Sequence, residues 1–271
     1  MGSSVITNIG AQVALRALNA TGAELDKVQK RVSTGYKVAD AVDDGASFAV
    51  AQGLRANIKA YGAVSERLSQ AKGLLSVTEA GLTNVSDTAS SIKEVLIKLS
   101  DSNLGAADRT KYEADYNALT AEITRSYTQA TFNGVGLLAT ASTAVNVVSD
   151  ISGGFLTIAK QDIQTALGTL GATAPSGAAI AFAAIAKIDT FQGTVGTALA
   201  AIGASSRSVD NQIKFTDGLN DAVTAGLGAI VDADLSKESA RLQSLQIRQQ
   251  LGTQSLSIAN QSPSILLSLF Q

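Results

Sequence analysis

The sequence contains no cysteine, no histidine and no tryptophan, and its 271 residues include only two prolines. Without cysteine the chain can form no disulfide and carry out no thiol chemistry. Without histidine it lacks the commonest physiological-pH base and the commonest zinc ligand. Because Pro175 and Pro263 are the only prolines, long stretches of the chain are free to be helical. We therefore expect no catalytic residue, no metal and no cofactor.

Charge is missing from both ends of the chain. No Asp, Glu, Lys or Arg precedes Arg16, and none follows Arg248. The formal net charge of −2 provides no basic surface for nucleic acid. The start of the chain lacks the basic and apolar regions of a cleaved signal peptide. We also expect no membrane span at the uncharged end, because polar residues and a proline interrupt it: Gln249, Gln250, Gln254, Asn260, Gln261 and Pro263.

Both uncharged ends are nevertheless patterned. Near the start, Ile6, Ile9 and Val13 recur at helical spacing. Near the end there are two apolar stripes, the first made of Leu242, Leu245, Leu256 and Ala259 and the second of Leu251, Ile258 and Ile265. The termini of a soluble monomer are usually poorly ordered unless something ties them down. Apolar, amphipathic termini need a partner, which indicates assembly with further copies of the chain rather than catalysis.

The clearest periodicity runs from Tyr61 to Leu99. Two sets of positions each repeat every seven residues and alternate with spacings of three and four through five heptads. The sets are Val64, Ala71, Thr78, Val85, Ile92 and Leu99, and Tyr61, Leu68, Leu75, Leu82, Ala89 and Leu96. This pattern is typical of a coiled coil or of a helix in a bundle.

A second series with seven-residue spacing lies in the C-terminal half, and a shorter helix is predicted over 108–131. The series consists of Ile188, Val195, Ile202, Val209, Thr216, Val223 and Ile230. Two long helices and a short one can bury each other's apolar faces in an antiparallel bundle. We therefore predict a mainly α fold: a long antiparallel helical bundle or coiled coil formed by the N- and C-terminal halves.

The middle of the chain has a different pattern. Phe132-Asn133-Gly134 is a turn signal after the short helix. Residues 145–148 and 155–158 are β-prone and are separated by Ser152-Gly153-Gly154, which predicts a small β-hairpin. Residues 168–179 are rich in Gly, Ala and Thr, and we expect an exposed connection there.

Two breaks divide the predicted helices into an outer and an inner pair. Ser33-Thr34-Gly35 predicts a helix end, followed by irregular chain through Asp43-Asp44-Gly45. In the C-terminal half, Gly226-Leu227-Gly228 predicts a second helix end, and Asp232-Ala233-Asp234 predicts a new N-cap. We therefore expect one domain made of residues 1–42 and 231–271. The other contains residues 43–230 and includes a variable hairpin and loop region at 139–179.

Three short patterns resemble chemical sites, and each has a simpler explanation. Ser90-Ser91-Ile92-Lys93 matches the S-x-x-K pattern of acyl-serine enzymes but lacks that motif's companion elements. Gly134-Val135-Gly136 begins like a phosphate-binding loop, but no strand precedes it. Asp43 and Asp44 are adjacent, and a solvated turn or a contact in the segment that connects the two predicted domains explains them better than a metal site does. The basic residues Arg31, Arg55, Lys59, Arg67 and Lys72 are dispersed, and we expect ion pairs from them, with Arg31 and Arg55 at an interface.

Several segments, in order along the chain, resemble the bacterial flagellin family. Residues 28–38 read VQKRVSTGYKV, 40–46 read DAVDDGA, 56–59 read ANIK and 132–134 read FNG. Towards the end, 233–240 read ADLSKESA, 249–252 read QQLG, 256–261 read LSIANQ and 265–270 read ILLSLF. The resemblance covers roughly 1–138 and 180–271 and leaves out the middle, which is where flagellins vary most.

The resemblance implies a short flagellin with little outer domain. It implies a filament-core domain of paired terminal helices (D0) and a surrounding bundle (D1), joined by a connecting segment called the spoke. The contacts in the core would come from Ile6, Ile9, Val13, Leu251, Leu256, Ile258, Ile265, Leu269 and Phe270, and the spoke or interface candidates are Arg31, Asp43, Asp44 and Arg55. The implied function is self-polymerisation into the extracellular flagellar filament used for motility.

The implied partners are further copies of the chain and other flagellins. The resemblance also implies the flagellar type III export apparatus, an export chaperone that binds the C-terminal helix, the filament cap and the hook-junction proteins. Two alternatives remain open from the sequence. One is a hook–filament junction protein, which shares the terminal pattern, and the other is a serine-type enzyme on a helical bundle.

Overall fold

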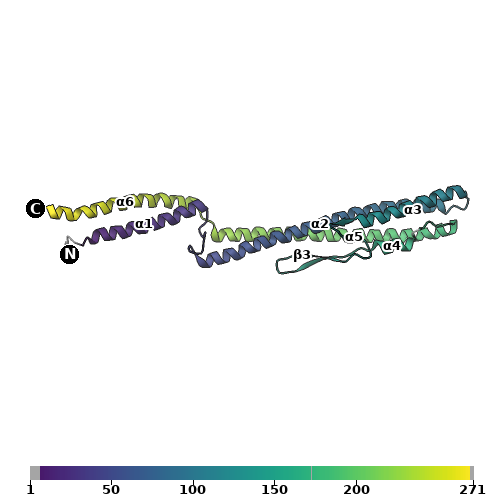
Figure 1. Ribbon diagram of the computed structural model, residues 1–271, viewed down its shortest axis with the longest axis horizontal. Helices are drawn as coiled ribbons and strands as arrows, with labels where there is room; N and C mark the ends of the chain where they lie inside the picture. Colours follow the sequence, from purple (N-terminus) through teal and green to yellow (C-terminus); the bar gives the residue numbers. More distant parts are fainter. Residues whose placement is uncertain (1–6, 172, 269–271) are drawn as a thin grey trace. The chain divides into compact units, whose positions relative to one another are not determined.

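The structure is a computed structural model that describes residues 7–171 and 173–268, with side chains through residue 261. Its helices are α1 (Ile9–Thr34), α2 (Gly45–Leu99), α3 (Ala106–Gln129), α4 (Ile163–Leu170), α5 (Ala178–Val231) and α6 (Leu235–Ser268) (Figure 1). The short strands are β1 (Thr131–Phe132), β2 (Val135–Gly136), β3 (Val145–Val148) and β4 (Phe155–Ile158). The predicted mainly α class with a small hairpin in the middle is confirmed.

The chain forms two compact units. Unit 1 comprises Met1–Ala56 with Ala222–Gln271, and unit 2 comprises Asn57–Asp221. Each unit joins segments from both halves of the sequence. The long helices α2 and α5 contribute residues to both units.

The core of unit 2 follows the heptad positions predicted on α2. All positions of the two series from Val64 to Leu99 are buried, and only Tyr61, at the start, is half-buried. On α5 the positions Ile188, Val195, Ile202 and Val209 belong to the same core. The apolar periodicity therefore predicted which faces of these two helices are buried against each other.

Polar contacts fix the direction and register of α2 against α5 in unit 2. Lys93 pairs with Asp189 and Lys72 with Asp210, each at 2.6 Å between Nζ and Oδ1. Ser65 donates to Asp217, and Gln192 donates to Ser90. The two residue numbers in every pair add up to the same value, which an antiparallel pairing without a register shift requires.

Helix α3 packs on α2 at a point where only a small residue fits. Tyr116, Thr120, Ile123 and Tyr127 form the buried face of α3. A Cβ placed on Gly81 would lie 2.6 Å from the Cβ of Ala130, closer than two carbons can approach. The glycine at position 81 of α2 therefore permits the close packing of Ala130, the residue that follows α3.

Two hairpins occupy the segment after α3. Asn133 and Gly134 both have positive φ angles, 51° and 77°, and join β1 to β2 as a tight turn. Strand β3 pairs with β4 in antiparallel register, from Val145 opposite Ile158 to Val148 opposite Phe155. The predicted hairpin is confirmed, and its side chains Val147 and Ile158 enter the core of unit 2.

The prediction of an exposed connection over 168–179 was wrong at its start. Residues 168–170 end α4, in which Ile163, Leu167 and Leu170 are buried. Asp162 caps this helix by accepting the N–H of Thr165. The spacing of four and then three residues between the buried positions is helical. The run is short and contains Gly168, which obscured the signal.

The predicted helix end at Gly226-Leu227-Gly228 was also wrong. Helix α5 continues to Val231. Each glycine within a helix costs about 1 kcal/mol relative to alanine. Burial of Val231, with Leu227 and Ile230 packed around it, against Val38 and Ala51 offsets that cost in unit 1. The predicted cap is confirmed, because Asp234 Oδ1 accepts the N–H groups of residues 236 and 237.

In unit 1, helices α1 and α6 lie side by side (Figure 1). Helix α1 ends at the predicted place, where Gly35 adopts φ 76° and its N–H bonds the carbonyl of Arg31. The chain after α1 is tied to the end of α5, because Lys37 N donates to Val231 O and Ala233 N donates to Gly35 O. These bonds hold the segment between α1 and α2 against the segment between α5 and α6.

Candidate assembly surface

The first predicted stripe of α6 packs against α1. The buried or half-buried positions of α6 alternate by three and four residues: Leu242, Leu245, Gln249, Gly252, Leu256 and Ala259. Helix α1 shows the same alternation in Ala11, Ala14, Leu18, Thr21, Leu25, Val28 and Val32. A Cβ on Gly252 would lie 3.1 Å from Leu18 Cδ1, so the two helices approach closely there. We call these two sets of positions the inner seam.

Within the described side chains, the second stripe of α6 points away from α1 and is exposed. Leu251 is 57% exposed and Ile258 is 64% exposed. On α1, Ile9 and Val13 are 68% and 54% exposed. We call these four residues, together with Ile247, the outer stripe. Ile247 was not among the contact residues predicted from the sequence, although its position four residues before Leu251 places it on the same helix face.

The predicted contact residues therefore divide into two groups. Leu256 belongs to the inner seam and is half-buried within the chain. Ile9, Val13, Leu251 and Ile258 lie on the outer stripe. The remaining predictions, Ile6 and the side chains of Ile265, Leu269 and Phe270, lie outside the described residues. Exposed apolar surface of this kind is typical of an interaction site.

The ion pair Arg31–Glu238 joins α1 to α6 at the other end of the inner seam. Arg31 Nη1 lies 3.1 Å from Glu238 Oε1, and the two side chains are only 18% and 12% exposed. The Nε of Arg31 and the Oε2 of Glu238 are buried without a hydrogen-bond partner. Arg31, a predicted interface residue, thus has its partner within unit 1. Arg55 is half-buried, and no ion pair involves it within the described side chains.

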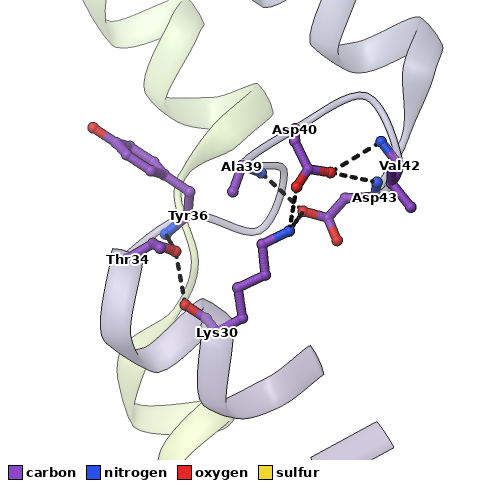
Figure 2. Close-up of polar contacts among 7 residues, drawn as sticks. All are labelled: Lys30, Thr34, Tyr36, Ala39, Asp40, Val42 and Asp43. Atoms are coloured by element: carbon purple, nitrogen blue, oxygen red, sulfur yellow. Dashed lines mark hydrogen bonds and ion pairs between the residues drawn. The ribbon is translucent and has the colours of Figure 1, made fainter. Parts of the chain in front are cut away.

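Lys30 binds two carboxylates in the segment between α1 and α2 (Figure 2). Its Nζ lies 2.5 Å from Asp40 Oδ2 and 3.0 Å from Asp43 Oδ2. Asp40 also accepts the N–H groups of Val42 and Asp43, and Asp43 accepts that of Ala39. We call Lys30, Asp40 and Asp43 the lysine clasp. It folds the connecting segment into a compact turn.

Asp44, next to the clasp, caps α2. Its Oδ1 accepts the N–H groups of Ala46 and Ser47, and its Oδ2 accepts the hydroxyl of Ser47. The hydrogen bond from the Ser47 hydroxyl is the main cause that holds the pKa of Asp44 below its usual 3.8. These two adjacent aspartates were predicted to form a solvated turn or a contact in the connecting segment. In the structure Asp43 binds Lys30 and Asp44 caps α2.

The lysine clasp contributes to the stability of the fold in a pH-dependent way, and the pKa shifts of its three residues give the direction of that dependence. The hydrogen bonds that Lys30 donates lower the pKa of both Asp40 and Asp43 below 3.8, and the same two bonds raise the pKa of Lys30 above 10.5. The stability that the two carboxylates contribute is thus fully present above pH 3.8, and it is lost as the pH falls through their lowered pKa values. The lysine contribution is fully present below pH 10.5 and is lost as the pH rises through the raised value.

We predict that Lys30→Met raises the pKa of Asp40 and of Asp43 back towards 3.8, because the main cause of both depressions is removed. NMR titration of the side-chain carboxyl carbons measures each value separately. Asp44 is the internal control, since Lys30 is not among the causes of its shift and its pKa should not change. Unchanged values for Asp40 and Asp43 would show that the clasp does not exist in solution.

The patterns that resembled catalytic motifs form ordinary structural contacts. The hydroxyl of Ser90 donates to the carbonyl of Ser86, and Lys93 is paired with Asp189 rather than with a serine. Gly134-Val135-Gly136 belongs to the β1–β2 hairpin. Over 7–171 and 173–268 there is no group of three potential metal-ligating side chains. Within the same part of the chain, every helix is too short or too polar to cross a bilayer.

Comparison with known proteins shows the family. Residues 5–143 match the bacterial flagellin N-terminal helical region, and residues 181–270 match the bacterial flagellin C-terminal helical region. The chain is 40% identical to flagellin FljM of Caulobacter vibrioides over 272 residues, covering 99% of both chains. It is 33% identical to a flagellin of Brucella melitensis over 284 residues, again covering 99% of both.

Solved structures show the same fold. The crystal structure of Bacillus cereus flagellin matches with a TM-score of 0.52 at 23% identity, covering 55% of this chain and 88% of that one. A structure described as a flagellar hook-associated protein of Vibrio parahaemolyticus matches with a TM-score of 0.57 at 16% identity, covering 70% and 100%. At these identities the likeness concerns the fold alone, whereas the full-length sequence matches concern flagellins. The chain belongs to the bacterial flagellin family, whose members are structural, non-enzymatic proteins that self-polymerise into the extracellular flagellar filament.

Proposed function

We propose that the outer stripe is the surface through which subunits of this flagellin contact one another in the filament core. The observation that carries the proposal is the exposure of Ile9, Val13, Leu251 and Ile258, each of which leaves more than half of its surface uncovered. Burial of such a side chain is favourable by about 1.5–3 kcal/mol. By their spacing in the sequence, Ile6, Ile265, Leu269 and Phe270 extend the same contact, and Leu256 supports it from the inner seam.

We further propose that residues 1–42 and 231–271 form the filament core and that residues 43–230 form the bundle around it. The breaks between α1 and α2 and between α5 and α6 support these boundaries. Arg31, Asp43 and Asp44 have partners within the chain and would act by shaping the connecting segment. Arg55 would bind a carboxylate of a neighbouring subunit.

The contact is heterologous, so that the face of one subunit meets a different face of the next. A heterologous contact that does not close generates a helical polymer. Before assembly the exposed apolar helix α6 would be held by an export chaperone. Export through the flagellar type III apparatus and folding under the filament cap would follow, with hook-junction proteins as further partners.

Cysteine protection tests the contact surface directly, because the natural chain has no cysteine. We predict that the thiol introduced by Ile258→Cys reacts freely in the monomer and at least about tenfold more slowly in the assembled filament. Thr143→Cys, at an exposed position of the variable region, is the control and should react equally in both states. Electron microscopy of the same samples after seeding confirms that filaments are present. Equal reactivity of the Ile258→Cys thiol in monomer and filament would refute the proposed contact.

A further inference from the structure

Asn8 immediately precedes α1, and its side chain hydrogen-bonds two different helices. Its Oδ1 accepts the N–H of Ala11 at 2.9 Å and so caps α1. Its Nδ2 donates to the backbone carbonyl of Ala259 in α6 at 2.7 Å, across 251 residues of sequence. A single amide group thus connects the first turn of α1 to one peptide unit of α6.

The carbonyl of Ala259 lies inside α6, which extends to Ser268. In an α-helix such a carbonyl accepts the N–H of the residue four positions later. Here that residue is Pro263, which has no N–H to donate. Helix α6 therefore leaves this acceptor open, and Asn8 supplies the missing donor.

We propose that Asn8 is a positioning residue that, together with the Arg31–Glu238 pair at the other end of the inner seam, sets the register of α1 against α6 by binding the carbonyl that Pro263 leaves open. The inner seam repeats every seven residues, so a shift by one heptad would still bury small and aliphatic side chains. A single polar contact within a repeating seam can specify one register. In the native alignment Asn8 meets a carbonyl that lacks its helical donor. A shift that pairs Leu18 with Leu245 would instead bring Asn8 to the carbonyl of Gly252, which the N–H of Leu256 binds within the helix.

The residue type fits this double task. Asparagine, aspartate and serine are similarly good N-caps, since each supplies a side-chain oxygen. Of these three, only asparagine also carries N–H donors beside that oxygen. Asn8→Ser therefore keeps a capping oxygen but removes the separate amide N–H, and its shorter side chain has a single oxygen for both contacts. Pro263→Ala restores an N–H within α6, so the carbonyl of Ala259 no longer needs Asn8.

An engineered disulfide can report the register. A Cβ placed on Gly252 lies 3.9 Å from the Cβ of Leu18, within the range found in disulfides. The pair Leu18→Cys with Gly252→Cys therefore reports the native alignment when filaments of the full chain are mildly oxidised. The pair Leu18→Cys with Leu245→Cys reports a shift by one heptad. Intrachain bridges are distinguished from bridges between subunits by the mass of the product under denaturing conditions.

The ratio to be measured is the disulfide yield of the native pair (positions 18 and 252) divided by that of the shifted pair (positions 18 and 245). We expect Asn8→Ser to lower this ratio about fivefold, which corresponds to the net effect of one hydrogen bond. In the Pro263→Ala background the same substitution should change the ratio less than twofold. If Asn8→Ser prevents assembly, the readout is whether adding Pro263→Ala restores filaments. An unchanged ratio, an equal effect in both backgrounds, or no rescue of assembly would each overturn the proposal. The ratio measures pairing within one chain, so it does not depend on the outer stripe being the subunit contact.

Discussion

Introducing two aspartates on the outer stripe, by Leu251→Asp with Ile258→Asp, is expected to abolish filament assembly at concentrations where the natural chain polymerises. Both residues are more than half exposed, so little packing within the same subunit is lost. In the filament each substitution removes about 1.5–3 kcal/mol of apolar burial and places a charge in an uncharged contact. Since each 1.4 kcal/mol is a factor of ten, the critical concentration should rise at least about a hundredfold. Sedimentation and electron microscopy after seeding measure it.

The matched control is Ser239→Asp with Gln246→Asp, which adds the same charge, with the same spacing of seven residues, at two exposed polar positions on a different face of α6. Helix α6 already carries Lys237, Glu238, Arg241 and Arg248 in that region, so additional charge there is tolerated. The control should therefore assemble at nearly the natural concentration. Assembly of the stripe variant at that same concentration would show that α6 contacts its neighbours through another face. Failure of both variants would indicate a general effect of charge.

Phe191→Ala is expected to lower the free energy of unfolding of unit 2 by about 3–5 kcal/mol, the usual cost of truncating a buried phenylalanine. Phe191 is 1% exposed and belongs to the core shared by α2 and α5. Denaturant unfolding followed by far-UV circular dichroism measures the change. The chain has no tryptophan to report by fluorescence.

Phe182→Ala is the control, because it is the same substitution in the same helix at a residue that is 72% exposed. A substitution at such a site usually changes stability by less than about 0.5 kcal/mol. The difference between the two variants therefore tests which face of α5 is buried. Equal effects of the two variants would mean that α5 is rotated about its axis relative to α2.

The errors in the sequence interpretation were local. The eight residues of α4 were assigned to a loop, because Gly168 and the following Gly- and Thr-rich run outweighed a short helical spacing. The end of α5 was placed too early, because two glycines resembled a stop. In both cases the burial of a few apolar side chains outweighed weak local preferences, and such burial depends on partners that are distant in the sequence.

The candidate surface could be predicted only in part. Two apolar stripes on the last helix were visible from their spacing, but nothing in the spacing indicated which stripe α1 covers. Gly252, which permits close approach to Leu18, marks the inner seam once both helices are in place. Ile247 was overlooked, although it completes the exposed face. Both assignments depend on how α6 is rotated about its own axis.

The sequence by itself determined the long helices, the buried positions of α2 and α5, the hairpin and the apolar, uncharged ends that predict assembly. These features follow from the periodicity of apolar residues along a single helix or strand, and this periodicity can be read from residues that are close together in the sequence. Only the tertiary structure decided which terminal stripe stays exposed, that Arg31 pairs with Glu238, and that Asn8 reaches the carbonyl of Ala259. These contacts join residues more than two hundred positions apart, and their geometry exists only once the two ends of the chain have packed together.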